Sequence, residues 1–143
     1  MSIMRLANIK CPKCGRECPT AVWDSLNVHL SPEARTKLLA GEINLFRCIS
    51  CGYEGLLSVP LLYHDMKNEF CVQFFPFNDI EKSEFLYSFS RDGEMAVDLN
   101  GAPDDVPTYF KRVHTVFGMD ELVRYVIFRE RLAERYSTEE KAS

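Results

Sequence analysis

The pattern of apolar and polar positions predicts a chain built mostly of strands. Short runs rich in β-branched and aromatic residues, bounded by turn-forming residues, are typical of strands. Such runs fall within Pro19–Leu30, Ile43–Arg47, Tyr53–Tyr63, Phe70–Phe75 and Lys111–Phe117. Phe85, Tyr87 and Phe89 recur at the two-residue period of a half-buried strand. The Asn-Gly pair and the two prolines of Asn100–Pro107 predict a loop.

Two segments predict helices. Over 31–40, Ser31 can cap the first turn, Pro32 fits the first helical position, and Gly41 can end the helix in a left-handed conformation. Over 120–136, apolar residues at helical spacing form one face: Leu122, Val126, Ile127 and Ala133. The strands and helices do not alternate as they do in a doubly wound parallel sheet, so the fold class is α+β.

Composition and charge narrow the possible functions. The 143 residues are 46% hydrophobic and 27% charged, which fits one domain or two small, tightly packed ones. The net charge is −4, but residues 1–60 carry seven Lys/Arg against five Asp/Glu, whereas residues 61–143 carry ten against sixteen. This acidic second half disfavours tight nucleic-acid binding by the whole surface, although a small basic patch in the first half is compatible with it.

The sequence predicts a cytoplasmic protein without membrane association. The longest apolar stretch, Leu56–Tyr63, is interrupted by Ser58 and Pro60 and is far shorter than the ~20 residues of a membrane span. The first ten residues lack the continuous apolar run of a signal peptide. We therefore expect six reduced cysteines, which are better suited to metal binding than to disulfides.

The candidate chemistry lies in two cysteine pairs, within Cys11–Gly15 and Cys48–Gly52. Each pair has two residues between its cysteines and a glycine directly after the second. This spacing lets both thiolates bind one ion from a single tight turn, and the glycine permits a positive φ. The predicted ligands of one Zn²⁺ are Cys11, Cys14, Cys48 and Cys51. The 33 residues between the pairs exceed the usual ~15–20, and the helix over 31–40 accounts for the excess as an insertion.

We expect the zinc to be structural, because four sulfur ligands leave no coordination position for a catalytic water. Two alternatives stay open at this point: a rubredoxin-like iron site, and two unrelated redox or buried cysteine pairs without a metal. Cys18 lies near the first turn and could replace a ligand, whereas Cys71 fits a small buried side chain in an apolar run. Four cations can offset the negative charge of the thiolates: Lys10, Lys13, Arg16 and Arg47.

With these motifs the chain resembles the CpXC protein family, which is named for two Cys-Pro-x-Cys motifs. The likeness includes Cys11–Gly15, Trp23–Asn27, Pro32–Gly41, Phe46–Cys48, Leu62–Met66 and Gly118–Leu122. The chain departs from the family pattern at Ile49, where the family has proline, but no ligand is lost because proline only stiffens the turn. The resemblance implies a bacterial or archaeal zinc-ribbon protein. Because the family has no established biochemical activity, it bears on fold and metal rather than on function.

The expected architecture combines these elements. A four-cysteine zinc ribbon with a helical insertion packs on a further β-rich segment and a C-terminal amphipathic helix. We place the zinc-ribbon region at residues 1–66, with its inserted helix at 31–40. The β-rich region with the helix 120–136 takes residues 67–143, and the two regions are expected to pack as a single CpXC-like domain.

A macromolecular interaction module or adaptor is the expected function. Seven aromatic residues stand close together in the second half: Phe70, Phe74, Phe75, Phe77, Phe85, Tyr87 and Phe89. They are expected to form the core of a sheet. If one row faces solvent instead, it offers an apolar patch to a protein partner or to a second copy of the chain.

Two other functions are compatible with individual residues. A nucleic-acid-associated zinc-ribbon regulator would use cations and stacking aromatics of the first half: Lys10, Lys13, Arg16, Trp23, Arg35, Lys37, Phe46 and Arg47. An enzyme would use His64, but Asp65 cannot orient it, because neighbouring residues of a strand point to opposite faces. His114 falls in a predicted strand and fits a packed or half-exposed side chain. The sequence contains no established catalytic motif, and we expect no catalytic residues.

Overall fold

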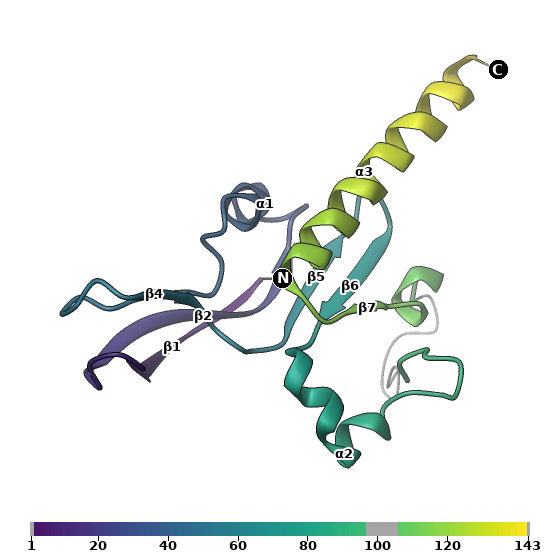
Figure 1. The fold of residues 1–143 in the computed structure, drawn as a ribbon. Coiled ribbons are helices and arrows are strands. Elements are labelled where there is room, and N and C mark those ends of the chain that lie inside the picture. Colours follow the sequence, from purple (N-terminus) through teal and green to yellow (C-terminus); the bar gives the residue numbers. More distant parts are fainter. Residues whose placement is uncertain (1, 97–105, 143) are drawn as a thin grey trace.

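The computed structural model describes residues 2–96 and 106–142, the last five as backbone only. Its largest element is a five-stranded sheet in the order β1-β2-β5-β6-β7 (Figure 1). These strands are β1 (Ile3–Lys10), β2 (Glu17–Asn27), β5 (Leu61–Asp65), β6 (Phe70–Phe74) and β7 (His114–Val116). The sheet is mixed: β1–β2 and β5–β6 are antiparallel pairs, whereas β2–β5 and β6–β7 are parallel.

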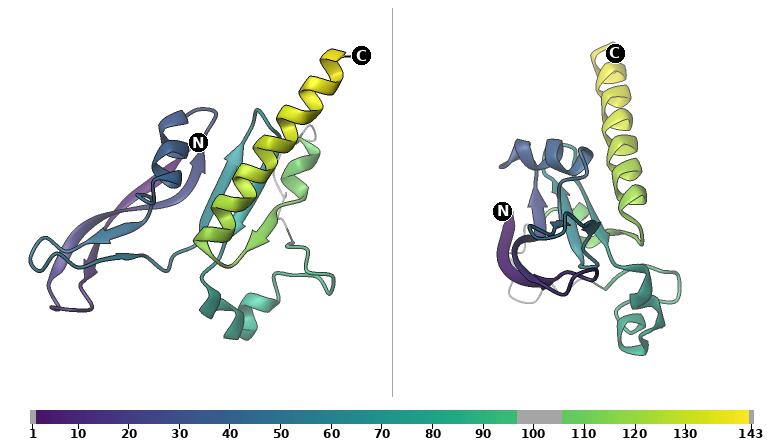
Figure 2. Two further views of the ribbon diagram at one scale, coloured as in Figure 1. Left: turned by 45° about the horizontal axis from the view of Figure 1, so that its top comes forward. Right: turned by 60° about the vertical axis from the view of Figure 1, so that its left-hand side comes forward.

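A second, two-stranded sheet and several helices complete the fold. The small antiparallel sheet consists of β3 (Leu45–Arg47) and β4 (Glu54–Leu56). The helical elements are α1 (Pro32–Leu39), η1 (Phe77–Glu81), α2 (Ser83–Leu86), η2 (Thr108–Lys111) and α3 (Met119–Ala142). In Figures 1 and 2, α3 lies across one face of the large sheet, and its C-terminal half projects beyond the sheet. The hairpins β1–β2 and β3–β4 extend together away from α3, so the molecule has two distinct ends.

Each end has its own cluster of buried side chains. The main core lies between the large sheet and the helices α1 and α3, and its fully buried members include Leu26, Tyr63, Val72, Leu122 and Val126. A smaller cluster lies at the hairpin end and consists of Cys11, Cys18, Phe46 and Cys48, with Ile9, Tyr53 and Leu57 packed around it.

The mixed α+β class predicted from the sequence is confirmed. The first helix begins at Pro32 as predicted and is followed by Gly41 with a φ of 75°. Ser31 occupies the N-cap position, but among the described residues its side chain makes no capping hydrogen bond. Its backbone carbonyl accepts a hydrogen bond from the Ala34 N–H at 3.0 Å instead. The fixed φ of Pro32 and the left-handed glycine therefore define this helix better than the cap does.

Two strand predictions are corrected. The expected strand through Phe85 and Phe89 is wrong, since Phe85 lies in α2 and Phe89 makes only an isolated bridge to Met95. The alternating rings form a compact cluster instead: Phe85 packs against Phe75 and Phe89, with ring centroids 4.8 and 5.0 Å apart. The predicted strand Tyr53–Tyr63 is split into β4 and β5, with Pro60, which has no N–H to donate, between them.

The other strand boundaries also differ from the predictions. Lys111–Phe117 becomes strand only at β7, after η2. Strand β1 was not predicted. It is an edge strand with most side chains exposed on both faces, so its sequence lacks the alternation of apolar and polar residues that marks a half-buried strand. The predicted loop Asn100–Pro107 lies largely outside the described residues.

The long helix is longer and less regularly buried than predicted. It runs over Met119–Ala142 rather than 120–136. Leu122 and Val126 of the predicted apolar face are fully buried in the main core, and Ala133 is half-buried. Ile127 is 41% exposed, so its place on that face was wrong. One helix turn covers 360° in 3.6 residues, and Ile127 therefore points about 100° away from Val126.

The aromatic segment contributes both core and surface. Phe70 and Phe74 are buried, Phe75, Phe85 and Phe89 are half-buried, and Phe77 and Tyr87 are 68% and 84% exposed.

The large sheet takes β1, β2 and β5 from the predicted zinc-ribbon region, and β6 and β7 from the predicted β-rich region. The boundary between the two regions falls in the turn between β5 and β6. Within the described residues, none of the helices combines the length and apolar character needed to cross a bilayer.

Candidate metal centre

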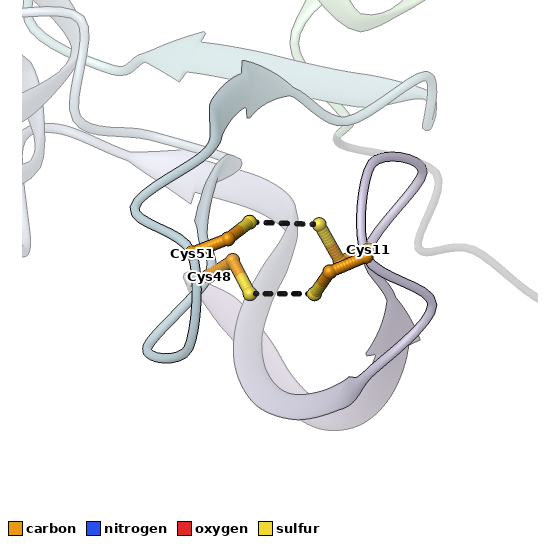
Figure 3. Close-up of side chains that lie close together, drawn as sticks. Cys11, Cys48 and Cys51 are labelled. Carbon is orange, nitrogen blue, oxygen red and sulfur yellow. Dashed lines mark hydrogen bonds between the residues drawn. The ribbon is translucent and has the colours of Figure 1, made fainter.

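Each cysteine pair lies in the turn at the tip of an antiparallel hairpin. The first turn joins Lys10 of β1 to Glu17 of β2, and the second joins Arg47 of β3 to Glu54 of β4. Strand pairing therefore closes both loops at their bases. The two tips then face each other across a short gap (Figure 3).

The two turns have nearly the same backbone geometry. In the first, the Gly15 N–H donates to the Cys11 carbonyl at 2.9 Å. In the second, the Gly52 N–H donates to the Cys48 carbonyl at 3.0 Å. Both glycines have a φ of 78°, in the left-handed region where a side chain would be strained. The glycine after each pair is therefore required by the turn, as the sequence predicts.

The four sulfur atoms are close enough to share one ion. One donor atom from each of Cys11, Cys14, Cys48 and Cys51 lies within 4.8 Å of all the others. The Cys11 and Cys51 sulfurs are 3.7 Å apart, and those of Cys14 and Cys48 are 3.5 Å apart. A tetrahedron of sulfurs about 2.3 Å from a central Zn²⁺ has edges of about 3.8 Å. The four thiols could therefore hold a metal ion with little movement.

The protein environment acts differently on the thiols of Cys11, Cys14 and Cys48. Backbone N–H groups of Cys51 and Ser50 lower the pKa of Cys48 to about 6. Burial opposes ionisation of Cys11, but the N–H groups of Cys14 and Lys13 outweigh it and lower its pKa. The Arg16 N–H acts on Cys14 in the same direction, yet the neighbouring sulfur of Cys48 and burial raise its pKa to about 11. A cation among the sulfurs would favour the ionised form of Cys14.

The remaining cysteines lie outside this group of four. Cys18 is buried beside the cluster and packs with Cys11, Cys48 and Phe46. Cys71 is buried in β6, where burial raises the pKa of its thiol to about 11. Its prediction as a small buried side chain is confirmed, and its raised pKa makes it a poor nucleophile.

The predicted basic and aromatic residues of the first half do not form one surface. Phe46 is buried beneath the cysteine turns, and the Arg47 guanidinium pairs with Glu54 at 3.2 Å. Arg35 lies at the other end of the molecule, where it makes a bidentate ion pair with Glu130 at 2.6 and 2.8 Å. The Lys10 side chain lies beside Gly15 of the first turn.

His64 and His114 each contact a tyrosine ring. His64 Nε2 is hydrogen-bonded to Tyr109 Oη at 2.7 Å, and burial lowers the pKa of the imidazole. Asp65 points away from it, as predicted, and accepts hydrogen bonds from the backbone and side-chain N–H groups of Asn68 at 3.0 and 2.9 Å. His114 stacks on the ring of Tyr125 with centroids 4.0 Å apart. No sequence pattern pointed to Tyr109, which is 45 positions from His64 and reaches it only through the tertiary fold.

The comparisons with known proteins concern the chain as a whole. A family model described as CpXC protein matches residues 9–137, nearly the entire chain, including all four cysteines of the cluster. No curated protein and no solved structure shows a significant match to the chain.

Proposed function

We propose that this chain, which belongs to the CpXC protein family, holds one structural Zn²⁺ and uses the stabilised fold as a macromolecular interaction module. The observation that carries the first half of the proposal is the convergence of four thiols from two hairpin tips. The proposed ligands are Cys11, Cys14, Cys48 and Cys51.

Zinc is favoured over the alternatives by chemistry and by local structure. All-sulfur, near-tetrahedral donor sets select zinc or iron, and zinc is the usual ion for two turns of this kind. A redox role would need one pair to react with a substrate, whereas here each pair faces the other. In this arrangement the metal closes a zinc ribbon with α1 inserted between its two hairpins. Four sulfur ligands complete the coordination, so the ion holds the hairpins together and activates no water.

The metal content of the protein tests this half directly. Native mass spectrometry of the protein captured gently from its own host should give one zinc per chain. Cys14→Ser and Cys48→Ser should lose that mass, whereas Cys71→Ser, which changes a thiol distant from the hairpin tips, should retain it. A folded chain without metal would overturn the proposal. One iron per chain, with the visible absorption of an iron–thiolate centre, would replace zinc by the rubredoxin-like alternative.

The interaction half rests on exposed apolar side chains in one short segment. Phe77 in η1, together with Leu86 and Tyr87 at the end of α2, is mostly exposed. Large aromatic residues carry much of the binding energy in protein interfaces and cost free energy when they face water. We therefore place the contact with a protein partner or a second copy of the chain on the segment 77–87.

Substitution of the exposed rings tests this assignment. The Phe77→Ser/Tyr87→Ser variant should lose a partner that the wild type retains in native mass spectrometry, or should shift a dimer toward monomer in sedimentation. Leu6→Ser/Leu30→Ser is the matched control, because it also removes two exposed apolar side chains but lies on β1 and before α1. Equal losses in both variants, or a wild type that is monomeric and unaccompanied, would contradict the assignment.

A further inference from the structure

A second candidate site lies in the opposite half of the molecule from the cysteines. It is a cavity of about 970 Å³ between the segment that contains α2, strand β7 and helix α3. Cavities that bind small molecules usually measure about 300–1,000 Å³. In Figure 1, α2 and β7 lie on the side of the molecule away from the tips of the β1–β2 and β3–β4 hairpins.

One wall of the cavity is aromatic. Phe85, Phe89 and Phe117 line it. Phe85 packs against Phe89 and Phe117 with centroids 5.0 and 6.3 Å apart, so the three rings support one another. All three side chains are half-buried. Such a wall can receive the face or edge of a further flat ring.

The cavity is also lined by four cations: Arg91, Lys111, Arg112 and Arg129. Within residues 2–96 and 106–142, none of the four forms an ion pair, whereas five cations elsewhere do: Arg5, Arg35, Arg47, Lys82 and Arg131. Asp92 and Glu94 line the cavity as well, but Asp92 already accepts hydrogen bonds from the Ser90 hydroxyl and the Glu94 N–H of its own turn. The cavity thus has an excess of positive charge in a chain whose net charge is −4.

Arg129 is held in place at the cavity by two contacts. Arg129 donates to Tyr125 Oη at 2.9 Å, and its guanidinium lies 4.8 Å from the centre of the Phe70 ring. These contacts fix the guanidinium while leaving other N–H groups available.

Arg112 and Arg129 also line a neighbouring open cavity of about 600 Å³. The two arginines therefore line both spaces. An anionic group bound there would contact both arginines, and the attached ring would extend toward the phenylalanines.

We propose that this cavity binds a small organic anion that carries a flat ring. The ring packs against Phe85 and Phe89, and the anionic group, a carboxylate or a phosphate, binds Arg112 and Arg129. Arginine suits this role because its planar fork binds both kinds of oxyanion through paired hydrogen bonds. The site is separate from the cysteine cluster and from the exposed rings of Phe77 and Tyr87, although Phe85 and Leu86 of the segment 77–87 line it.

Titrations of the zinc-loaded full chain, followed by amide NMR shifts, test the proposal. The probes are adenosine monophosphate for a ring with phosphate and indole-3-acetate for a ring with carboxylate. At least one should bind about tenfold more tightly than adenosine, which has the ring but no charge, and than inorganic phosphate, which has no ring. The shifts should concentrate in residues 85–95 and in β7. The tighter of the two probes identifies the preferred anionic group.

A charge-matched pair of variants separates the cavity from general attraction to cations. Lys111→Gln/Arg112→Gln should weaken binding about tenfold, because two charges at the site are lost. Lys37→Gln/Lys67→Gln removes the same charge from exposed positions outside the cavity and should change binding less than about twofold. Equal weakening in the two variants, adenosine binding as tight as the monophosphate, or no saturable binding of either probe would overturn the proposal.

Discussion

The cysteine hairpins and the sheet–helix core differ in how much apolar surface they bury. Among the described residues, the main core contains thirteen buried side chains, which come from α1, α3, most strands of the large sheet and the loops beside them. The hairpin cluster contains four, and two of them, Cys11 and Cys48, belong to the sulfur group. Burial of a large side chain contributes about 1.5–3 kcal/mol, so the hairpin cluster alone offsets little chain entropy. Packing therefore contributes much more to the stability of the core end than to that of the hairpin end, which the proposed metal would cross-link.

Removal of the metal should produce the largest effect. Structural zinc contributes on the order of 10–16 kcal/mol of apparent binding free energy, as much as the whole stability of an average domain. We expect Cys48→Ser in the presence of a chelator to lose the native amide signals of at least residues 1–66. Retention of the native amide spectrum under these conditions would show that packing alone holds the hairpins. Signals that persist only in β6, β7 and α3 would show that the main core is partly independent.

The next largest effect should come from the main core. Leu122→Ala removes a fully buried side chain between α3 and the sheet and should lower the free energy of unfolding by about 2–5 kcal/mol. Ile127→Ala, five positions along the same helix and 41% exposed, should cost about 0.5 kcal/mol. Urea unfolding of the zinc-loaded variants measures both values. Similar costs would contradict the burial pattern of α3.

Asn44 joins the two regions, and its loss should have an intermediate effect. Its buried side chain accepts a hydrogen bond from the Trp23 N–H at 2.7 Å and donates to the Trp23 carbonyl at 3.0 Å, which ties the start of β3 to β2. Asn44→Ala should lower the free energy of unfolding by about 2 kcal/mol because these bonds are lost. It should lower it by about 1 kcal/mol more because alanine is strained at the φ of 54° that this position adopts. Asn44→Gly loses the same bonds but tolerates that φ, so it should be less destabilising. A more stable alanine variant in urea unfolding would refute this.

The Arg35–Glu130 ion pair connects α1 to α3 within the main core region, and its effect should be the smallest. A double-mutant cycle with Arg35→Gln and Glu130→Gln should give a coupling energy of about 1 kcal/mol. The Arg5–Asp24 pair of the β1–β2 hairpin is more exposed, and its closest N···O distance is 3.1 Å rather than 2.6 Å. A double-mutant cycle on this pair should therefore give a coupling energy of less than about 0.5 kcal/mol. The reverse ranking, measured by urea unfolding, would mean that burial does not set the strength of these pairs.

The sequence was sufficient for features that depend on a few neighbouring residues. The spacing of Cys11 and Cys14, and of Cys48 and Cys51, places both sulfurs of each pair on one turn. Gly15 and Gly52 are needed because the turns require a positive φ. The first helix follows from Pro32 and Gly41, and the family resemblance followed from the same short motifs. Covalent geometry restricts these positions before any distant contact forms.

Only the tertiary structure decided which distant segments meet. The parallel pairing of β2 with β5, the contact of Tyr109 with His64 and the exposure of Ile127 depend on how the sheet and α3 pack. The alternation of Phe85 and Phe89 predicted a strand, but their packing with Phe75 produced a compact aromatic cluster. The cations of the second cavity come from three separated segments and have no common motif. Local spacing determines the conformation of a turn, whereas the partner of a strand or ring is chosen by the free energy of burying the whole chain.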